Sequence, residues 1–512
     1  VACQNKAKDA PDGDKVVSLW HRARASLPAP TDNSALMTCD LFPGVACHTS
    51  PDALARYAVP ERGAPGHTAC VLLPADAVEV GQILRTAQVA RQPLVISAGR
   101  TGLVEAQRPE GETVLSLEKL NRILSIDAAN QRAEVEAAVP VDTLNAALEA
   151  HGLVWPMEMG STSAATVGAC VANGSAGANA VCYGTAAHLC ETAYGLWADG
   201  RETGPQAGPH WNATAPQLLA IDSAAPDVQQ GLIGTQGVLG VITRLTLRLH
   251  PLPAQREAAL IPVADMPAAM RVLALARDVF GSDVEEFEFI SATAMALVRA
   301  MQGESFRWPF ERDPQAAFYL LLQVKSDDAD EDLAAHLYQF LTETLQQPED
   351  ALGYAPLKAL KRIRHSITEA SNHAMKALGG GRLAFDTATP VEVFGDYLAA
   401  LEIALKALYP QMQLVAFGHA GVGGAHLHLL GTAAQPVQAH ADALVKLVFD
   451  VTAAHRGTFS AEHGVGSKWG AAFAERAAPQ VVAELVAAKR AHDPSHILNP
   501  RCFGLDQLVR RA

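Results

Sequence analysis

Three glycine-dense loops, each placed directly after a short apolar run typical of a strand, constrain the fold of this chain most. They span residues 99–102, 160–166 and 234–240. Small residues let backbone N–H groups approach a pyrophosphate and bind it without side-chain charge. Glycine is also the default residue wherever a turn needs positive φ, so each loop alone is better explained as an ordinary turn. Only the three loops taken together favour a dinucleotide-binding site.

The usual nucleotide-binding fingerprints are absent from the sequence. Neither G-x-G-x-x-G nor G-x-x-x-x-G-K-[ST] occurs. Both motifs place phosphates at the N-terminus of a helix after a glycine turn. A nicotinamide-dependent or ATP-dependent enzyme of the corresponding folds is therefore disfavoured.

Length and composition limit the class of protein. At 512 residues the chain corresponds to about three domains. Hydrophobic residues make up 49% and charged residues 18%, which excludes global disorder. The net charge of −14 argues against nucleic acid as a partner, because a phosphate backbone would be repelled. An anionic substrate would need a local basic pocket.

The cysteines and the apolar windows bear on redox chemistry and location. The chain has eight cysteines and no C-x-x-C pair, which disfavours an iron–sulfur cluster or a zinc knuckle, and we interpret them as buried free thiols. No apolar window is long enough for a membrane-spanning helix, and the first twenty residues lack the apolar region of a secretory signal. We expect a cytoplasmic protein, or a mitochondrial one if the source is eukaryotic, with any membrane contact peripheral.

The pattern along the chain predicts four parts. Residues 1–62 form an N-terminal extension, and residues 63–253 alternate strands and helices in two α/β lobes. Residues 254–455 carry long Ala/Leu-rich helices and short apolar strands, typical of an α+β layer. Residues 456–512 form a tail that returns to the second part.

A candidate metal site is visible in the stretch LVAFGHAGVGGAHLHLLG. Two apolar strands flank a glycine turn, and an antiparallel hairpin would place His419 directly opposite His426. Opposed side chains lie about 4.5–5.5 Å apart at Cβ, so both imidazoles can reach one metal ion. His428 shares the face of His426. Hydrogen-bonded histidines without a metal remain an equally good interpretation.

The third candidate ligand is Glu462 in SAEHGVGSK, with His463 beside it as a base. Two imidazoles and one carboxylate are a known donor set for zinc and similar metals. Neighbouring residues of a regular strand face opposite ways, so both can serve one site only if this segment is a loop. A surface Glu-His turn is the alternative.

The first half resembles the FAD-binding domain of the vanillyl-alcohol oxidase family. The resemblance rests on PLVISAGRTGLVEAQ, VLSLEKLNRILSID, GSTSAATVGA, SAGANAVCYGT and LIGTQGVLGVIT. It implies an α+β chain, with a PCMH-type FAD-binding domain of two α/β subdomains and an α+β FAD-linked oxidase C-terminal cap domain. FAD would be noncovalent, since the first loop has no histidine. The implied FAD contacts are Gly99, Arg100, Thr101, Gly102, Leu103, Gly160, Ser161, Thr166, Gly168, Gly177, Asn179, Tyr183, Gly237, Gly240, Val241, Ile242 and Asn499.

The second half resembles FAD-linked D-2-hydroxyacid dehydrogenases, including D-lactate and D-2-hydroxyglutarate dehydrogenases. Their pattern G-H-x-G-D-G-N-x-H, followed later by E-H-G-x-G, matches the histidine stretch and SAEHGVGSK. The resemblance implies His419, His426 and Glu462 as ligands of zinc or manganese. It implies His463 as the general base. RIRHSITEA resembles the segment that holds the substrate carboxylate, which would be Arg364 and Thr368.

Two departures from that pattern bear on the substrate. Residues 422–424 read Val-Gly-Gly where the family has Asp-Gly-Asn. The hydroxyglutarate enzymes have a lysine where this chain has Ala384, and Arg382 is out of register with it. Both losses argue against a second substrate carboxylate, and SAGANAVCYGT is closest to the D-lactate branch.

The resemblance therefore predicts FAD-dependent oxidation of a D-lactate-like 2-hydroxy acid to the 2-oxo acid. The electron acceptor would be a quinone, a cytochrome or an electron-transfer flavoprotein, and the sequence leaves open whether the chain forms a homodimer. A flavin-binding subunit that only relays electrons is one alternative, supported by Val422 and Gly424. A flavin oxidase acting on an alcohol or sugar is another.

Overall fold

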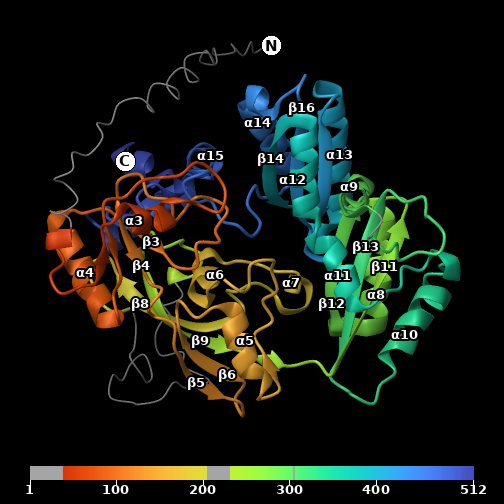
Figure 1. Cartoon of the computed structure of the whole chain (residues 1–512), viewed down its shortest axis with the longest axis horizontal. Helices are drawn as coiled ribbons and strands as arrows, with labels where there is room; N and C mark the ends of the chain where they lie inside the picture. The colour runs from red at the N-terminus through yellow and green to blue at the C-terminus, as the bar shows by residue number, and fades with distance from the viewer. Residues whose placement is uncertain (1–38, 204–230, 304–305, 512) are drawn as a thin grey trace, which may run out of the picture.

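The structure is a computed structural model that describes residues 39–203, 231–303 and 306–511. Figure 1 shows two halves side by side, one coloured red to yellow-green and the other green to light blue. Cys3 and most of the expected N-terminal extension lie outside the described residues.

The first sheet of the N-terminal half is small and mostly parallel. It has the strand order β1-β2-β4-β3, with the bounds Cys47–His48, Val71–Leu72, Thr113–Ser116 and Leu94–Ser97. Helices α3 (Pro51–Ala58) and α4 (Ala77–Ala90) accompany it. The Asp76 side chain accepts hydrogen bonds from the backbone amides of Val78 and Glu79. This N-cap explains why α4 begins directly after Asp76. The first glycine loop follows β3 directly.

The second sheet of this half is antiparallel. Its order is β5-β6-β9-β8, with the bounds Ile123–Asp127, Arg132–Glu136, Gly240–Arg248 and Cys190–Trp197. Helices α5 (Val141–Glu149), α6 (Val167–Asn173) and α7 (Ala180–Tyr183) lie between β6 and β8 in the chain. A short pair, β7 (Leu153–Val154) with β10 (His250–Pro251), joins the end of this sheet to the next half. The second glycine loop precedes α6, and the third precedes β9.

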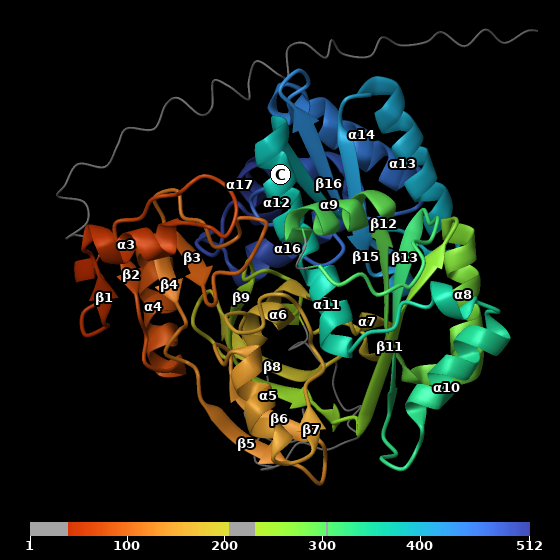
Figure 2. The same ribbon diagram turned by 45° about the vertical axis from the view of Figure 1, so that its right-hand side comes forward.

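The C-terminal half is built on a six-stranded antiparallel sheet. Its order is β11-β13-β12-β15-β16-β14, with the bounds Gln255–Val263, Phe318–Ser326, Val284–Ser291, Gln413–Gly418, Gly424–Thr432 and Gly379–Ala388. One face is covered by α8 (Met266–Phe280), α10 (Leu333–Gln339), α13 (Phe394–Leu408) and α14 (Ala441–Ala454). The other is covered by α9 (Ala292–Gln302), α11 (Leu357–His365) and α12 (Ile367–Leu378), as Figure 2 shows.

Apolar and acidic side chains alternate along β12, so this strand turns its acidic side chains to one face of the sheet. Phe287 and Phe289 pack into the core under α8 and α13. Glu286 and Glu288 therefore point to the opposite face, where they are at most 1% exposed. Buried carboxylates in an apolar strand need charged partners, so this face must supply them.

The tail after β16 and α14 packs on the N-terminal half. It contains α15 (Gly470–Arg476), α16 (Pro479–His492) and α17 (Leu505–Arg511). The buried ammonium of Lys489 donates to the carbonyls of Val238 and Leu498 at 2.7 Å each, which ties the tail to the third glycine loop. In Figure 1, α15 accordingly lies beside the red and orange elements.

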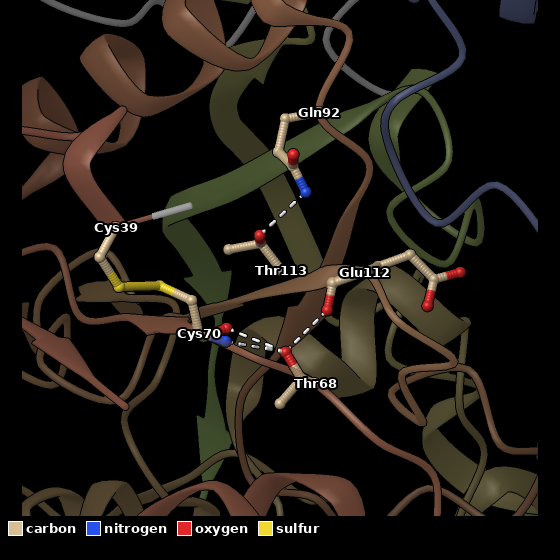
Figure 3. Close-up of a disulfide and its surroundings, with 6 residues drawn as sticks. All are labelled: Cys39, Thr68, Cys70, Gln92, Glu112 and Thr113. Carbon is tan, nitrogen blue, oxygen red and sulfur yellow. Dashed lines mark hydrogen bonds between the residues drawn. A yellow bond between two sulfur atoms is a disulfide. The ribbon is translucent and has the colours of Figure 1, made fainter. Parts of the chain in front are cut away.

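One expectation about the cysteines is wrong. Cys39 and Cys70 form a disulfide (Figure 3) because the pairing of β1 with β2 brings the segment before β1 against the sheet. The Thr68 hydroxyl donates to the carbonyl of Cys70 at 3.0 Å, which orders this edge. The thiols of Cys170, Cys190 and Cys502 are buried as expected, whereas Cys47 is exposed and Cys182 is partly exposed.

The longest helices in the described ranges, α8 and α13, have 15 residues each. Within those ranges no helix has both the length and the apolar character needed to cross a bilayer.

Candidate active site

A cavity of about 690 Å³ lies between the N-terminal half and the six-stranded sheet. The three glycine loops contribute to its lining on one side. Strands β12, β14 and β16, helix α11 and the loop after α14 contribute the other side. The cavity therefore joins elements that the sequence separates by more than 300 residues, such as Gly99 and Glu462.

Most of the residues expected to contact FAD line this cavity. They are Gly99, Arg100, Thr101, Gly102, Leu103, Gly160, Ser161, Gly168, Gly177, Gly237, Gly240, Val241, Ile242 and Asn499. Asn499 is also a structural link, because its side chain accepts the amide of Ile96 at 2.8 Å and donates to the carbonyl of Gln236 at 2.6 Å. It thereby joins the strand before the first loop to the third loop.

Three of the residues expected to contact FAD, Tyr183, Thr166 and Asn179, lie outside the lining of the cavity. The Tyr183 hydroxyl donates to Glu285 at 3.3 Å and its ring packs on His250, because α7 lies against β12. Thr166 and Asn179 stand at the starts of α6 and α7, and each is buried with a side-chain oxygen that has no hydrogen-bond partner.

The lining of the N-terminal side fits a dinucleotide cofactor. A Cβ atom at Gly99 would lie 2.1 Å from the carbonyl oxygen of Ala164, so the first two loops pack backbone to backbone. Ser97, the last residue of β3, lines the cavity with a buried hydroxyl that has no partner. A wall of bare backbone with an unsatisfied hydroxyl is the surface that a pyrophosphate or a flavin ring edge would contact.

Three side chains on the opposite side converge as one donor set. Nε2 of His419 lies 3.3 Å from Nε2 of His426 and 2.8 Å from Oε1 of Glu462. Nε2 of His426 lies 3.9 Å from Oε2 of Glu462. Two imidazole nitrogens and a carboxylate oxygen at this spacing fit a single divalent cation with positions left for substrate.

The register of the hairpin that carries the histidines differs from the expected one. Strands β15 and β16 pair Phe417 with His426, so His419 lies beyond the end of β15. The predicted opposition of His419 and His426 is wrong because the connection contains a 3₁₀ turn, Ala420–Val422, closed by Gly423 at φ +72°. The turn still directs the His419 ring to within 5.2 Å of the His426 ring, measured between centroids.

Burial and charge give the two histidines opposite protonation tendencies. Burial lowers the pKa of both rings. At His419 the carboxylates of Glu288 and Glu462 outweigh burial and raise the pKa well above its ordinary value. At His426 the neighbouring charge of His419 adds to burial and holds the pKa well below it.

Glu462 and His463 lie in a loop, and Asp386 of β14 organises it. Oδ2 of Asp386 accepts the backbone amides of Glu462 at 2.8 Å and His463 at 2.9 Å, and lies 3.3 Å from Nδ1 of His463. The ring of His463 stacks on His426 and is more exposed than the three candidate ligands. Asp386 was missed by sequence reasoning, although an acid inside the apolar strand LAFDTA was a signal.

Arg364 and Thr368 line the same cavity from α11 and the start of α12. Nε of Arg364 donates to Glu288, whose other oxygen contacts Nδ1 of His419, and the guanidinium lies 4.7 Å from the Phe417 ring centroid. Burial would raise the pKa of Glu288, but Arg364 and His419 hold it at about 2. Glu288 was also missed; the charges alternating with phenylalanines in VEEFEFIS were its signal.

Residues 422–424, which read Val-Gly-Gly instead of Asp-Gly-Asn, differ in how close they lie to the cavity. Val422 is 39% exposed and does not line the cavity, so the missing aspartate removes nothing from the lining. A Cβ at Gly424 would lie 3.4 Å from Cβ of His419. The missing asparagine would therefore stand beside a candidate ligand.

Comparisons with known proteins match both halves. Residues 68–203 match a FAD binding domain, and residues 252–502 match the C-terminal domain of FAD linked oxidases. A D-2-hydroxyglutarate dehydrogenase of Xanthomonas citri pv. viticola is 27% identical over 92% of this chain and 96% of its own. The mitochondrial D-2-hydroxyglutarate dehydrogenase of Bos taurus is 27% identical over 85% of this chain and 76% of its own.

Solved structures show the same fold at lower sequence identity. A p-cresol methylhydroxylase covers 92% of this chain and 96% of its own at 16% identity, with a TM-score of 0.65. A 4-ethylphenol oxidase from Gulosibacter chungangensis covers 94% and 99% at 16% identity, with a TM-score of 0.67. The expected fold class, a PCMH-type FAD-binding domain with a FAD-linked oxidase C-terminal domain, is confirmed.

Proposed function

Because the chain belongs to the FAD-linked oxidases, with a FAD binding domain followed by the C-terminal domain of that group, we propose that it oxidises a D-2-hydroxy acid to the 2-oxo acid. One observation carries the proposal: His419, His426, Glu462, His463 and Arg364 converge on the cavity that the glycine loops line. Relatives named D-2-hydroxyglutarate dehydrogenase support the same chemistry.

The cofactors would be held by residues on opposite sides of the cavity. FAD bound against the glycine loops would supply the acceptor for the hydride that leaves C2 of the substrate. A divalent cation, zinc or manganese, held by His419, His426 and Glu462 would supply a Lewis acid that lowers the pKa of the substrate hydroxyl. The donor set and its spacing support this assignment.

In this proposal Arg364 and Thr368, which both line the cavity, bind the substrate carboxylate. Nε of Arg364 donates a hydrogen bond to Glu288. The terminal nitrogens of the guanidinium can therefore bind a ligand in the cavity. Thr368 lies four residues further along and adds a hydroxyl donor to the same wall. Hydrogen bonds to a charged group contribute about 1.5–3 kcal/mol each. A local guanidinium also offsets the repulsion of an anion by a chain with a net charge of −14.

In this proposal His463, which lines the same cavity, takes the hydroxyl proton. Its Nδ1 faces Asp386 at 3.3 Å, so a proton on Nδ1 leaves Nε2 as the acceptor. The carboxylate fixes the ring orientation and stabilises the imidazolium formed when the proton arrives. The base acts while the C2 hydride departs, which is the proton transfer that an alcohol oxidation requires.

Anaerobic titration of the flavin spectrum with D- and L-2-hydroxy acids tests the proposal. The oxidised flavin has an absorption band at 450 nm. We expect at least one D-acid to bleach this band and its L-enantiomer not to do so. Absence of bleaching by every member would favour a subunit that only relays electrons. Bleaching by alcohols, phenols or sugars alone would favour an oxidase of those compounds. The reduced enzyme then serves to compare a quinone, a cytochrome and an electron-transfer flavoprotein as acceptors.

A further inference from the structure

Lys361 of α11 joins the two halves of the molecule through a carboxylate on each side. Its ammonium donates to both side-chain oxygens of Glu158 in the N-terminal half, at 2.7 Å each, and lies 3.2 Å from Oε2 of Glu286 in β12. In Figures 1 and 2, α11 accordingly lies at the junction of the halves, beside α7. Lys361 and Glu158 are 203 residues apart in the sequence, so the fold brings them together.

The three charges of this link are largely shielded from water. The side chains of Glu286, Lys361 and Glu158 are 1%, 16% and 32% exposed. Burial raises the pKa of Glu286 to about 7, and the charge of Lys361 opposes that rise. Burial lowers the pKa of Lys361, but Glu286 and Glu158 outweigh burial and raise it. Each charge therefore depends on the others, and removing one leaves an unpaired charge in a shielded place.

On the N-terminal side, Glu158 supports two segments that we assign to the flavin site. Its backbone carbonyl accepts the amide of Ala178 at 2.9 Å, and a Cβ atom at Gly177 would lie 2.3 Å from the same oxygen. The second glycine loop begins two residues later, at Gly160. Glu158 and both segments contribute to the lining of the cavity. A shift of Glu158 would therefore move the backbone against which FAD would bind.

On the other side, Lys361 belongs to a pair of ion pairs that fix α11 on β12. Lys361 and Arg364 are three residues apart, about one helical turn, so they lie on neighbouring positions of one helix face. Their partners, Glu286 and Glu288, are two residues apart and share one face of the strand. Glu288 also contacts His419. The helix that carries the proposed carboxylate-binding arginine is thus tied both to β12 and, through Lys361, to the N-terminal half.

We propose that Lys361 is a positioning residue that fixes the flavin side of the cavity relative to the substrate side. The inference rests on the proposed function. Hydride transfer needs its two reacting atoms about 3–3.5 Å apart, and an error of about 1 Å can lower the rate about 10²-fold. The bond between Lys361 and Glu158 spans the two sides between which the hydride moves, so it holds this separation. Lys361 acts through its partners and takes no part in the chemistry.

The first test is Glu158→Gln, which cuts the link between the halves and leaves Lys361 paired with Glu286. Anaerobic stopped flow on the FAD-loaded full chain measures flavin reduction over a range of concentrations of a D-2-hydroxy acid that bleaches the wild type. The limiting rate should fall about 10-fold or more, while the concentration giving half that rate changes less than about threefold. Glu402→Gln is the matched control, because it breaks an exposed pair with Lys406 inside α13. A limiting rate equal to that of the wild type would overturn the proposal.

The second test changes Lys361 itself. Lys361→Arg keeps a cation that can bind a carboxylate through two N–H groups and should retain most of the limiting rate, whereas Lys361→Met should lose it. In the Glu158→Gln background, Lys361→Met should lower the rate by a smaller factor than it does alone, because both residues act through one bond. Equal factors in the two backgrounds would contradict the proposal. FAD content and circular dichroism show whether each variant folds, and Glu158→Gln alone suffices if Lys361→Met does not.

Hydrogen–deuterium exchange tests the link without any substrate. In FAD-loaded Glu158→Gln, the backbone amides of α11 and of residues 158–168 should exchange faster than in the wild type, because local opening no longer breaks an ion pair. The amides of α14, on the far face of the six-stranded sheet, should be unchanged. If no 2-hydroxy acid reduces the flavin, the proposed function fails, and this measurement decides whether Lys361 holds the halves together. Equal exchange of α11 in both proteins would show that it does not.

Discussion

Asp386 contacts His463 twice: it accepts the backbone amide at 2.9 Å and lies 3.3 Å from Nδ1 of the ring. One carboxylate on β14 therefore holds both the loop and the orientation of the proposed base. The same oxygen accepts the amide of Glu462, so the position of a candidate metal ligand depends on it as well. The base and the ligand are coupled through one strand residue.

Replacing Asp386 by Asn should separate its structural role from its electrostatic one. The amide oxygen still accepts a backbone N–H, but the charge that stabilises a protonated His463 is lost. We expect the variant to fold and bind FAD normally and to reduce its flavin roughly 100-fold more slowly with a D-2-hydroxy acid. Single-turnover stopped flow measures the rate. A rate equal to that of the wild type would show that Asp386 has only a structural role.

Metal content should follow the three converging side chains. Purified wild-type protein should contain about one zinc or manganese ion per chain by elemental analysis, as expected for a site with three protein ligands. His426→Ala and Glu462→Gln should each lower that value toward zero, because two remaining donors bind weakly. His151→Ala, at an exposed position, is the control. If the wild-type enzyme stays active after chelation has removed the metal, the reaction does not require a metal ion.

Arg364→Lys should weaken substrate binding although the charge is kept. A lysine ammonium cannot pair with Glu288 and bind a carboxylate with a planar fork at the same time. We expect KM for a 2-hydroxy acid to rise about 10-fold or more, with FAD content unchanged. Steady-state kinetics with an artificial acceptor measures this. An unchanged KM would place the substrate carboxylate elsewhere in the cavity.

The disulfide between Cys39 and Cys70 should stabilise the N-terminal half. It closes a segment with a sequence separation of 31, for which the chain-entropy relation gives about 3–4 kcal/mol. Cys39→Ser should lower the free energy of unfolding in urea by roughly that amount, whereas Cys47→Ser, at an exposed free thiol, should not. If the wild type and Cys39→Ser have equal urea midpoints of unfolding under oxidising conditions, the disulfide between Cys39 and Cys70 does not form.

Local motifs allowed the site to be predicted in outline. The glycine loops, the histidine stretch and the Glu-His pair each contain their chemistry within a few neighbouring residues, so the candidate ligands and base were visible in the sequence. The hairpin register was wrong by two positions because a 3₁₀ turn and a tight turn cannot be told apart from glycines alone. Tyr183 lies outside the cavity lining because α7 packs on β12, a contact between distant parts of the chain that the local sequence does not reveal.

The residues that were missed act across large sequence separations. Glu288 and His419 are 131 residues apart, and Asp386 and His463 are 77 apart. A buried acid in an apolar strand indicates that a partner exists, but only the sheet order identifies the partner.

The rate of flavin reduction in His463→Ala shows whether His463 acts as the general base. Full-length protein loaded with FAD is mixed anaerobically with the D-2-hydroxy acid that bleaches the wild type fastest, and absorbance at 450 nm is followed by stopped flow. If His463 is the general base, FAD and metal content should be normal and the reduction rate should be lower by about 10²- to 10⁴-fold, the range for loss of a general base. Reduction at the wild-type rate would contradict it.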